Sequence, residues 1–144
     1  MQKLIAILQI KSRNFKDFKL WLDWYLKFLQ CDKVIILDDD SLFDLTKLFF
    51  LYDNNKIIYL KMNELNLSRY NDIRQVSNLK YIFDNNYIQK NDIVFTPDDD
   101  EFWWYDKNNY NSFKTCIMHK MDILNTDCIS VPWILMNNNY NFIS

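Results

Sequence analysis

Apolar residues along the chain form two kinds of pattern: short continuous runs, and longer segments in which they recur every three or four positions. Continuous apolar runs of about five to seven residues are typical of strands that a parallel sheet buries on both faces. Recurrence at three and four is typical of helices that bury one face. The predicted strands are residues 4–10, 33–37, 56–60 and 93–95, and the predicted helices are residues 15–29, 42–52 and 67–83.

These segments alternate as strand, helix, strand, helix, strand, helix, strand. The order predicts an α/β fold, namely a Rossmann-like, mostly parallel sheet with right-handed crossovers and helices on both faces. Beyond the fourth strand the pattern is weaker. Residues 110–121 predict a further helix, and residues 127–135 predict another strand, which Pro132 places at an edge or a bulge.

Length and charge narrow the class of protein. A chain of 144 residues has room for one domain, so residues 1–144 are expected to form a single domain. The net charge of −2 gives no general attraction for phosphate backbones, which argues against a nucleic-acid partner. No apolar run is long enough to span a membrane, and the three cysteines, an odd number, fit reduced thiols. We therefore expect a cytoplasmic protein with no membrane span.

The chain contains no glycine, which changes how its turns are made. Asparagine and aspartate are the next residues to tolerate positive φ. The Asn pairs at 54–55, 85–86 and 108–109 and the Asn run at 137–139 are therefore predicted turns. Phosphate-binding loops that depend on glycine are excluded.

Acidic residues follow two of the predicted strands. Asp38, Asp39 and Asp40 follow the second strand, and four acids at 98–101 follow the fourth. Consecutive carboxylates repel one another, so a cation that neutralises them explains their place at the mouth of a buried strand. Oxygen ligands without nearby Cys or His favour Mg²⁺ or Mn²⁺ over zinc. Two simpler interpretations remain open: a solvated acidic turn, and acids that cap the following helix together with Ser41.

Ligands of open parallel sheets bind outside the carboxyl ends of the strands, where both acidic clusters are expected to lie. A nucleotide diphosphate accounts for two such clusters. One cluster would bind the base or ribose, and the other would hold a metal ion that bridges the two phosphates.

Three stretches of the sequence resemble the GT-A glycosyltransferases, in particular their family-2-like and family-92-like members. The stretches are 29–41 (LQCDKVIILDDDS), 94–102 (VFTPDDDEF), which contains the D-x-D-E-F pattern, and 131–133 (VPW). Asn14 and residues 21–25 (WLDWY) also fit the pattern of the family. The resemblance extends over nearly the whole chain and implies a GT-A fold of the nucleotide-diphospho-sugar transferase type.

The resemblance also implies an activity, the metal-dependent transfer of a sugar from a nucleotide sugar to a glycan, protein or lipid acceptor. The expected donor is a UDP-sugar. Asp39, with Asp38 beside it, would bind the uracil or the ribose. Asp98 and Asp100 would be the D-x-D pair, with Asp100 as the direct Mn²⁺ or Mg²⁺ ligand and Asp98 as a ribose or water-mediated contact. Glu101 would lie near the donor sugar and is the one candidate for a catalytic residue.

Other polar and aromatic side chains have two interpretations each. Arg74 or Arg69 would meet the diphosphate, or both are solvated helix charges. His119 is a metal ligand or a structural histidine. Trp103 and Trp104 stack on a sugar ring or pack beneath the metal site.

The sequence departs from the family at several positions. Phe15 stands where the family has Glu, and Gln30 stands where it has Gly. Inverting members hold their catalytic base beyond the V-P-W strand, and we find no convincing candidate after Asp127. The C-terminal part of the fold is therefore expected to be truncated. The chain would be the nucleotide-binding portion of a longer enzyme, or a non-catalytic remnant that acts as a binding or interaction module. A nucleotidyltransferase with paired acids on Mg²⁺ is a third hypothesis.

Overall fold

The computed structural model describes residues 1–65, 74–129, 135–136 and 142–143. The chain divides into two compact units, Met1–Tyr105 and Asp106–Ser144. The first unit holds the parallel sheet and the second holds a helix and a short hairpin. The expectation of a single domain over residues 1–144 stays a prediction.

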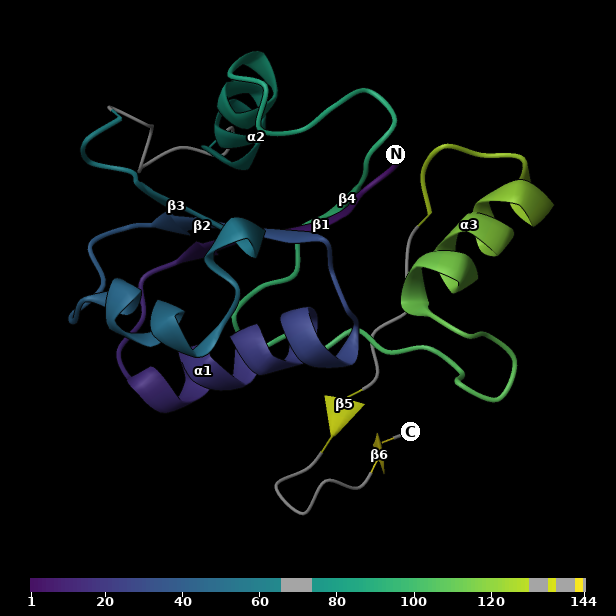
Figure 1. Cartoon of the computed structure of the whole chain (residues 1–144), viewed down its shortest axis with the longest axis horizontal. Coiled ribbons are helices and arrows are strands. Elements are labelled where there is room, and N and C mark those ends of the chain that lie inside the picture. Colours follow the sequence, from purple (N-terminus) through teal and green to yellow (C-terminus); the bar gives the residue numbers. More distant parts are fainter. Residues whose placement is uncertain (66–73, 130–134, 137–141, 144) are drawn as a thin grey trace. The chain divides into compact units, whose positions relative to one another are not determined.

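The first unit is built on a four-stranded sheet in which every pairing is parallel. Its strands are β1 (Leu4–Ile10), β2 (Lys33–Asp38), β3 (Ile57–Lys61) and β4 (Ile93–Phe95). Their order across the sheet is β3-β2-β1-β4, so β1 and β2 are central (Figure 1). This confirms the predicted α/β fold with a Rossmann-like parallel sheet. The four apolar runs predict the strands to within one residue, because the apolar positions of these strands are buried or half-buried.

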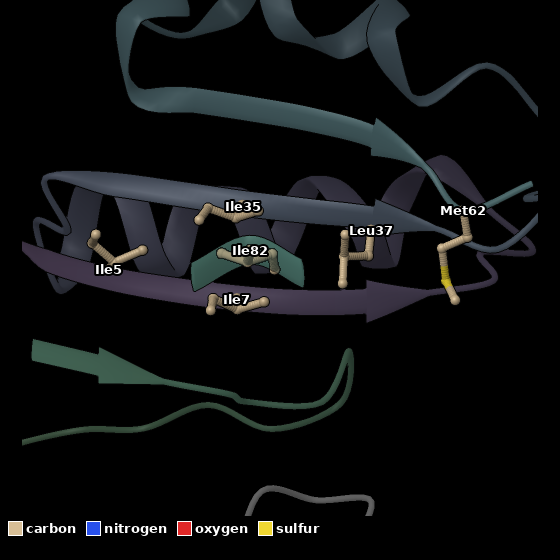
Figure 2. Packing of buried hydrophobic residues seen from close by; sticks show 6 residues of the cluster. All are labelled: Ile5, Ile7, Ile35, Leu37, Met62 and Ile82. Carbon is tan, nitrogen blue, oxygen red and sulfur yellow. The ribbon is translucent and has the colours of Figure 1, made fainter. Parts of the chain in front are cut away.

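One face of the sheet is covered by α2 (Arg74–Asp84). Alternate residues of the two central strands point to this face, where Ile82 of α2 packs on them (Figure 2). The fully or nearly fully buried members of this cluster are Ile5, Ile7, Ile35, Leu37, Met62 and Ile82. Burying a side chain of this size contributes about 1.5–3 kcal/mol.

The opposite face is covered by α1 (Phe15–Asp23) and its continuation η1 (Trp24–Phe28), one turn of π-helix (Figure 1). Asn14 begins α1, because its side chain accepts a hydrogen bond from the Asp17 amide at 2.8 Å. Trp21 and Tyr25 are fully buried against the sheet. The predicted helix at 15–29 is confirmed, and with α2 on the other face so are helices on both faces.

The prediction of an α-helix at 42–52 is wrong, because the chain forms a 3₁₀ helix there, η2 (Leu45–Leu51), followed by the short turn η3 (Asn54–Lys56). The expected cap, Ser41, is engaged elsewhere: its hydroxyl accepts a hydrogen bond from the Ser12 amide at 2.9 Å. Asp44 caps η2 instead, accepting from the Thr46 amide at 3.0 Å. The helix therefore begins at Leu45, three residues later than predicted, and forms a short 3₁₀ helix.

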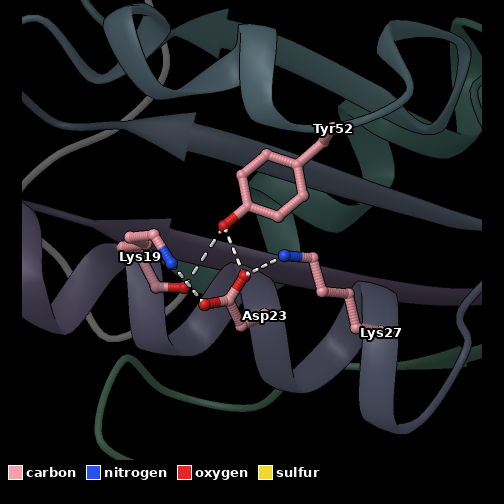
Figure 3. Close-up of polar contacts among 4 residues, drawn as sticks. All are labelled: Lys19, Asp23, Lys27 and Tyr52. Carbon is pink, nitrogen blue, oxygen red and sulfur yellow. Dashed lines mark hydrogen bonds and ion pairs between the residues drawn. The ribbon is translucent and has the colours of Figure 1, made fainter.

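A polar cluster attaches α1 to the end of η2 (Figure 3). Asp23 pairs with Lys19 at 2.6 Å and with Lys27 at 3.0 Å, one helical turn away on either side. The Tyr52 hydroxyl donates to the same carboxylate at 2.8 Å. Burial alone would raise the pKa of Asp23, but these three hydrogen bonds outweigh it and lower the pKa to about 2.

The second unit contains α3 (Phe113–Leu124), and β5 (Leu135–Met136) paired antiparallel with β6 (Phe142–Ile143). The predicted helix at 110–121 is present but begins three residues later, because Ser112 caps it. Residues 127–129 of the predicted strand at 127–135 are not in a strand. Its residues 130–134, which include the V-P-W stretch, lie outside the described residues, as does the predicted turn at 137–139.

Four residues have positive φ in the part of the chain that the structure describes: Gln30, Asp40, Asn86 and Asn125. Asn86 lies in the predicted turn at 85–86, and Asn125 ends α3 in the left-handed conformation. The pairs at 54–55 and 108–109 make turns without positive φ. All three cysteines are free and two of them are buried. Among the described helices, none has the length and apolar character that crossing a membrane requires.

Candidate functional site: the acidic turn after β4

The sheet topology sets where the two acidic clusters lie. β1 stands between β2 and β4, so the loops after β2 and β4 are separated by two strand spacings, about 10 Å. The loop after β1 lies between these two loops and contains Lys11 and Arg13, which are both exposed. The strand ends are offset, because Phe95 of β4 pairs with Ala6 whereas Asp38 of β2 pairs with Ile10. The cluster after β4 therefore starts further back along the sheet than the one after β2.

Asp38 is the structural member of the first cluster. Its side chain is buried, with 6% exposed, and one carboxylate oxygen accepts from the Ser41 amide at 2.9 Å. The other oxygen accepts from the Tyr59 hydroxyl. Burial and this hydrogen bond raise the pKa of Tyr59, so its hydroxyl remains a donor at neutral pH. Asp38 thus holds the turn after β2 and joins it to β3.

The next two acids reach toward solvent. Asp39 is half-buried, and its amide continues the sheet by donating to the Ile10 carbonyl at 2.8 Å. Asp40 is exposed, has a φ of 54°, and accepts from the Asn63 side chain at 3.0 Å. Asp39 and Asp40 are therefore both more accessible to solvent than Asp38.

Residues Asp98–Glu101 form a closed turn, here called the acidic turn. The Glu101 amide donates to the Asp98 carbonyl at 3.1 Å, and the Glu101 carboxylate accepts from the Asp98 amide at 3.0 Å. Asp99 and Asp100 are exposed at its tip. Partial burial raises the pKa of Asp98, as do the negative charges of Glu101, Asp100 and Asp99. A cation at this turn would relieve that repulsion.

Three side chains of the helix α1–η1 bind the backbone of the acidic turn and of the residues after it. Trp21 donates to the Asp98 carbonyl at 3.1 Å, and Tyr25 donates to the Glu101 carbonyl at 2.7 Å. Trp24 donates to the Trp103 carbonyl at 2.6 Å. The residue spacing of the helix at 15–29 predicts a buried face, but it does not predict these hydrogen bonds. The available signal was that three aromatics with polar atoms, 21, 24 and 25, share one helix face, since buried Trp and Tyr need hydrogen-bond partners.

The other predicted site residues fall in different places. Arg74 begins α2, although its side chain lies outside what the structure describes, and Arg69 lies outside the described residues. Trp103 packs against Phe95 with ring centroids 5.0 Å apart, whereas Trp104 is 56% exposed. His119 belongs to α3 of the second unit.

The donor chemistry of the acidic turn fits a magnesium or manganese ion only in part. Within the described residues, no group of three or more Asp, Glu, His or Cys side chains is arranged to hold a metal ion. Asp98 and Asp100 alone supply two carboxylates. Mg²⁺ is commonly bound by one or two carboxylates together with substrate phosphates and water. The turn therefore fits a metal that arrives with a phosphate ligand rather than a resident structural ion.

The fold and the site together define an α/β protein whose parallel sheet has acidic residues after two strands. Comparison with protein-family models, with curated proteins and with solved structures found no match to the chain.

Proposed function

We propose that the chain is a metal-dependent, nucleotide-sugar-binding domain of the GT-A glycosyltransferase type, with a UDP-sugar as donor and a glycan, protein or lipid as acceptor. The observation that supports it is the acidic turn: two exposed or partly exposed carboxylates, Asp98 and Asp100, on a rigidly held backbone after β4. A second acidic cluster follows β2, two strands away in a sheet of the Rossmann type.

Each part of a nucleotide diphosphate has a chemical counterpart in the proposal. Asp100 binds Mn²⁺ or Mg²⁺ directly. Asp98 either contacts the ion through a water molecule or binds the ribose. Asp39 binds the uracil or ribose, and Asp38 keeps the turn that presents Asp39. Arg74 remains the proposed contact for the diphosphate, because phosphate oxygens prefer guanidinium donors.

Calorimetry with UDP in the presence of Mn²⁺ tests the proposal. The intact chain is expected to bind, and Asp100→Ala is expected to weaken binding at least tenfold because it removes a direct ligand of the ion. Asp99→Ala is the matched control, since Asp99 is equally exposed on the same turn and has the same charge. Absence of binding by the intact chain, or equal losses in both variants, would contradict the proposal. Tighter binding of UTP than of UDP-sugar would favour a nucleotidyltransferase.

A second function, nucleotide binding without sugar transfer, is favoured by the state of Glu101. Its carboxylate accepts from the Asp98 amide at 3.0 Å and so closes the acidic turn. A group used in this way orients the turn rather than removing a proton from an acceptor. The two functions separate in an assay of UDP-sugar hydrolysis and transfer with chain that binds UDP and Mn²⁺. Turnover lost in Glu101→Gln with binding retained would support transfer, and binding without any turnover would support the binding module.

A further inference from the structure

The acidic turn is attached to α1–η1 through its backbone. The donors Trp21, Trp24 and Tyr25 are spaced at i, i+3 and i+4, so they lie on one face of the helix. Each donates to a main-chain carbonyl of residues 98–103, at distances between 2.6 and 3.1 Å. No carboxylate is used in these contacts, so the helix fixes the turn and leaves the acids of its tip exposed.

The Tyr25 hydroxyl makes two hydrogen bonds to this backbone. It donates to the Glu101 carbonyl at 2.7 Å and accepts from the Trp103 amide at 3.2 Å. The side chain is fully buried, and burial raises the pKa of Tyr25. The hydroxyl therefore remains protonated and serves as donor and acceptor at once.

Contacts between aromatic rings also restrain the backbone around the acidic turn. The Tyr25 ring lies 5.7 Å from that of Phe95, and Phe95 lies 5.0 Å from Trp103. Trp24 meets Phe102 edge-on at 5.6 Å. Since Phe95 ends β4, these contacts connect the sheet, the helix and the segment after the turn in one set.

A turn with four consecutive carboxylates needs such restraint. The four adjacent carboxylates repel one another, which favours an open and extended conformation of the turn. Any opening leaves the buried groups of Trp21 and Tyr25 without partners, which costs free energy. The helix α1–η1 thus keeps the acidic turn closed, with its four acids close together, before any cation binds.

We propose that Tyr25, supported by Trp21 and Trp24, is a positioning residue that presets the acidic turn for cation binding. The inference rests on the proposed function for its ligand. For the conformation of the turn it rests only on the hydrogen bonds and rings described above. Preorganisation of this kind raises affinity because the turn does not have to be ordered when the ion binds.

Tyrosine-to-phenylalanine variants provide the test, because the chain offers a matched pair. Tyr25→Phe removes the hydroxyl that bridges the turn, whereas Tyr52→Phe removes a hydroxyl that binds Asp23 on the same helix. We expect Tyr25→Phe to weaken Mn²⁺–UDP binding about tenfold and to speed amide hydrogen exchange of residues 98–103 by a similar factor. Tyr52→Phe is expected to leave both quantities within a factor of two.

Two readouts separate this inference from the proposed function. If the wild-type chain binds no Mn²⁺–UDP but Tyr25→Phe alone speeds exchange in residues 98–103, the positioning role stands and the proposed ligand is wrong. If the wild type binds and Tyr25→Phe changes neither affinity nor exchange, the positioning role is wrong. Should Tyr25→Phe fail to fold, Trp24→Phe removes the donor to the Trp103 carbonyl from a half-buried position and is judged by the same two criteria.

Discussion

At the scale of single residues, the absence of glycine moves conformational cost onto other side chains. Asn86 and Asn125 adopt positive φ, as expected of the residue type that tolerates it next best. Gln30 does the same, with φ of 55°, directly after the helix α1–η1. It is also the position where the sequence departs from the glycine of the GT-A pattern. A side chain with a Cβ costs about 1 kcal/mol in this conformation.

Gln30→Gly is therefore expected to stabilise the protein by about 0.5–1 kcal/mol, because Gly removes the Cβ clash and Gln30 is exposed. The free energy of unfolding in urea measures the effect. Gln30→Ala is the control, since alanine keeps the Cβ and should gain nothing. Equal stabilities of the Gly and Ala variants would mean that the positive φ at this position stores no strain.

At the scale of elements, the strands were predictable and the connections were less so. Continuous apolar runs identify strands buried on both faces, and β1 coincides with its predicted range. The segment 42–52 has helical spacing, yet it forms a 3₁₀ helix because Ser41 binds the loop after β1 instead of capping a helix. That bond joins residues 12 and 41, and a local pattern holds no information about a partner so far along the chain.

The candidate site was likewise predictable in its location but not in the role of each residue. The acids after β2 and β4 were predicted from strand ends, and parallel pairing accounts for their location at the same edge of the sheet, on either side of the loop after β1. The different roles of these acids were not predictable. The Asp38 carboxylate accepts hydrogen bonds from Ser41 and Tyr59, whereas Asp99 and Asp100 are exposed at the tip of a turn. These roles depend on burial and on tertiary hydrogen bonds, which sequence periodicity does not encode.

The contact between α1 and η2 is expected to be sensitive to acid. The pKa of Asp23 is lowered to about 2, so its ion pairs add stability that is complete above about pH 4 and is lost as the pH falls through 2. Asp23→Asn should be less stable than wild type at pH 6 by only on the order of 1 kcal/mol, since the side chains of Lys19 and Lys27 are 44% and 61% exposed and solvent screens their charges. Thermal unfolding at several pH values measures this, and the difference should shrink toward pH 2. A difference independent of pH would show that the charge of Asp23 contributes nothing.

At the scale of the whole molecule, metal and nucleotide are expected to bind as one unit. In the proposal the acidic turn provides one direct ligand of the ion, Asp100, and a second carboxylate nearby, Asp98, and phosphate oxygens complete the coordination. UDP with Mn²⁺ at about a hundred times the dissociation constant should stabilise the chain by about 2.7 kcal/mol, which is roughly 5–10 °C in melting temperature. Neither component alone should produce more than a small part of that shift.

Melting curves with UDP, with Mn²⁺, with both, and with both plus a chelator check this coupling. Asp100→Ala should melt like wild type in the absence of ligands, because its side chain is exposed, and should lose the joint shift. Equal shifts from Mn²⁺ alone and from the pair would point to a resident ion that does not need the nucleotide.

The attachment of the acidic turn to α1–η1 also has a consequence for how the chain matures. The three hydrogen bonds join residues that are 76, 77 and 79 positions apart. Closing a loop of that length costs about 4 kcal/mol of chain entropy. During synthesis on a ribosome, α1 emerges long before residues 98–103 exist. The indole and phenol groups of α1–η1 lack these partners until then, so we expect the acidic turn to form late in the folding of the first unit.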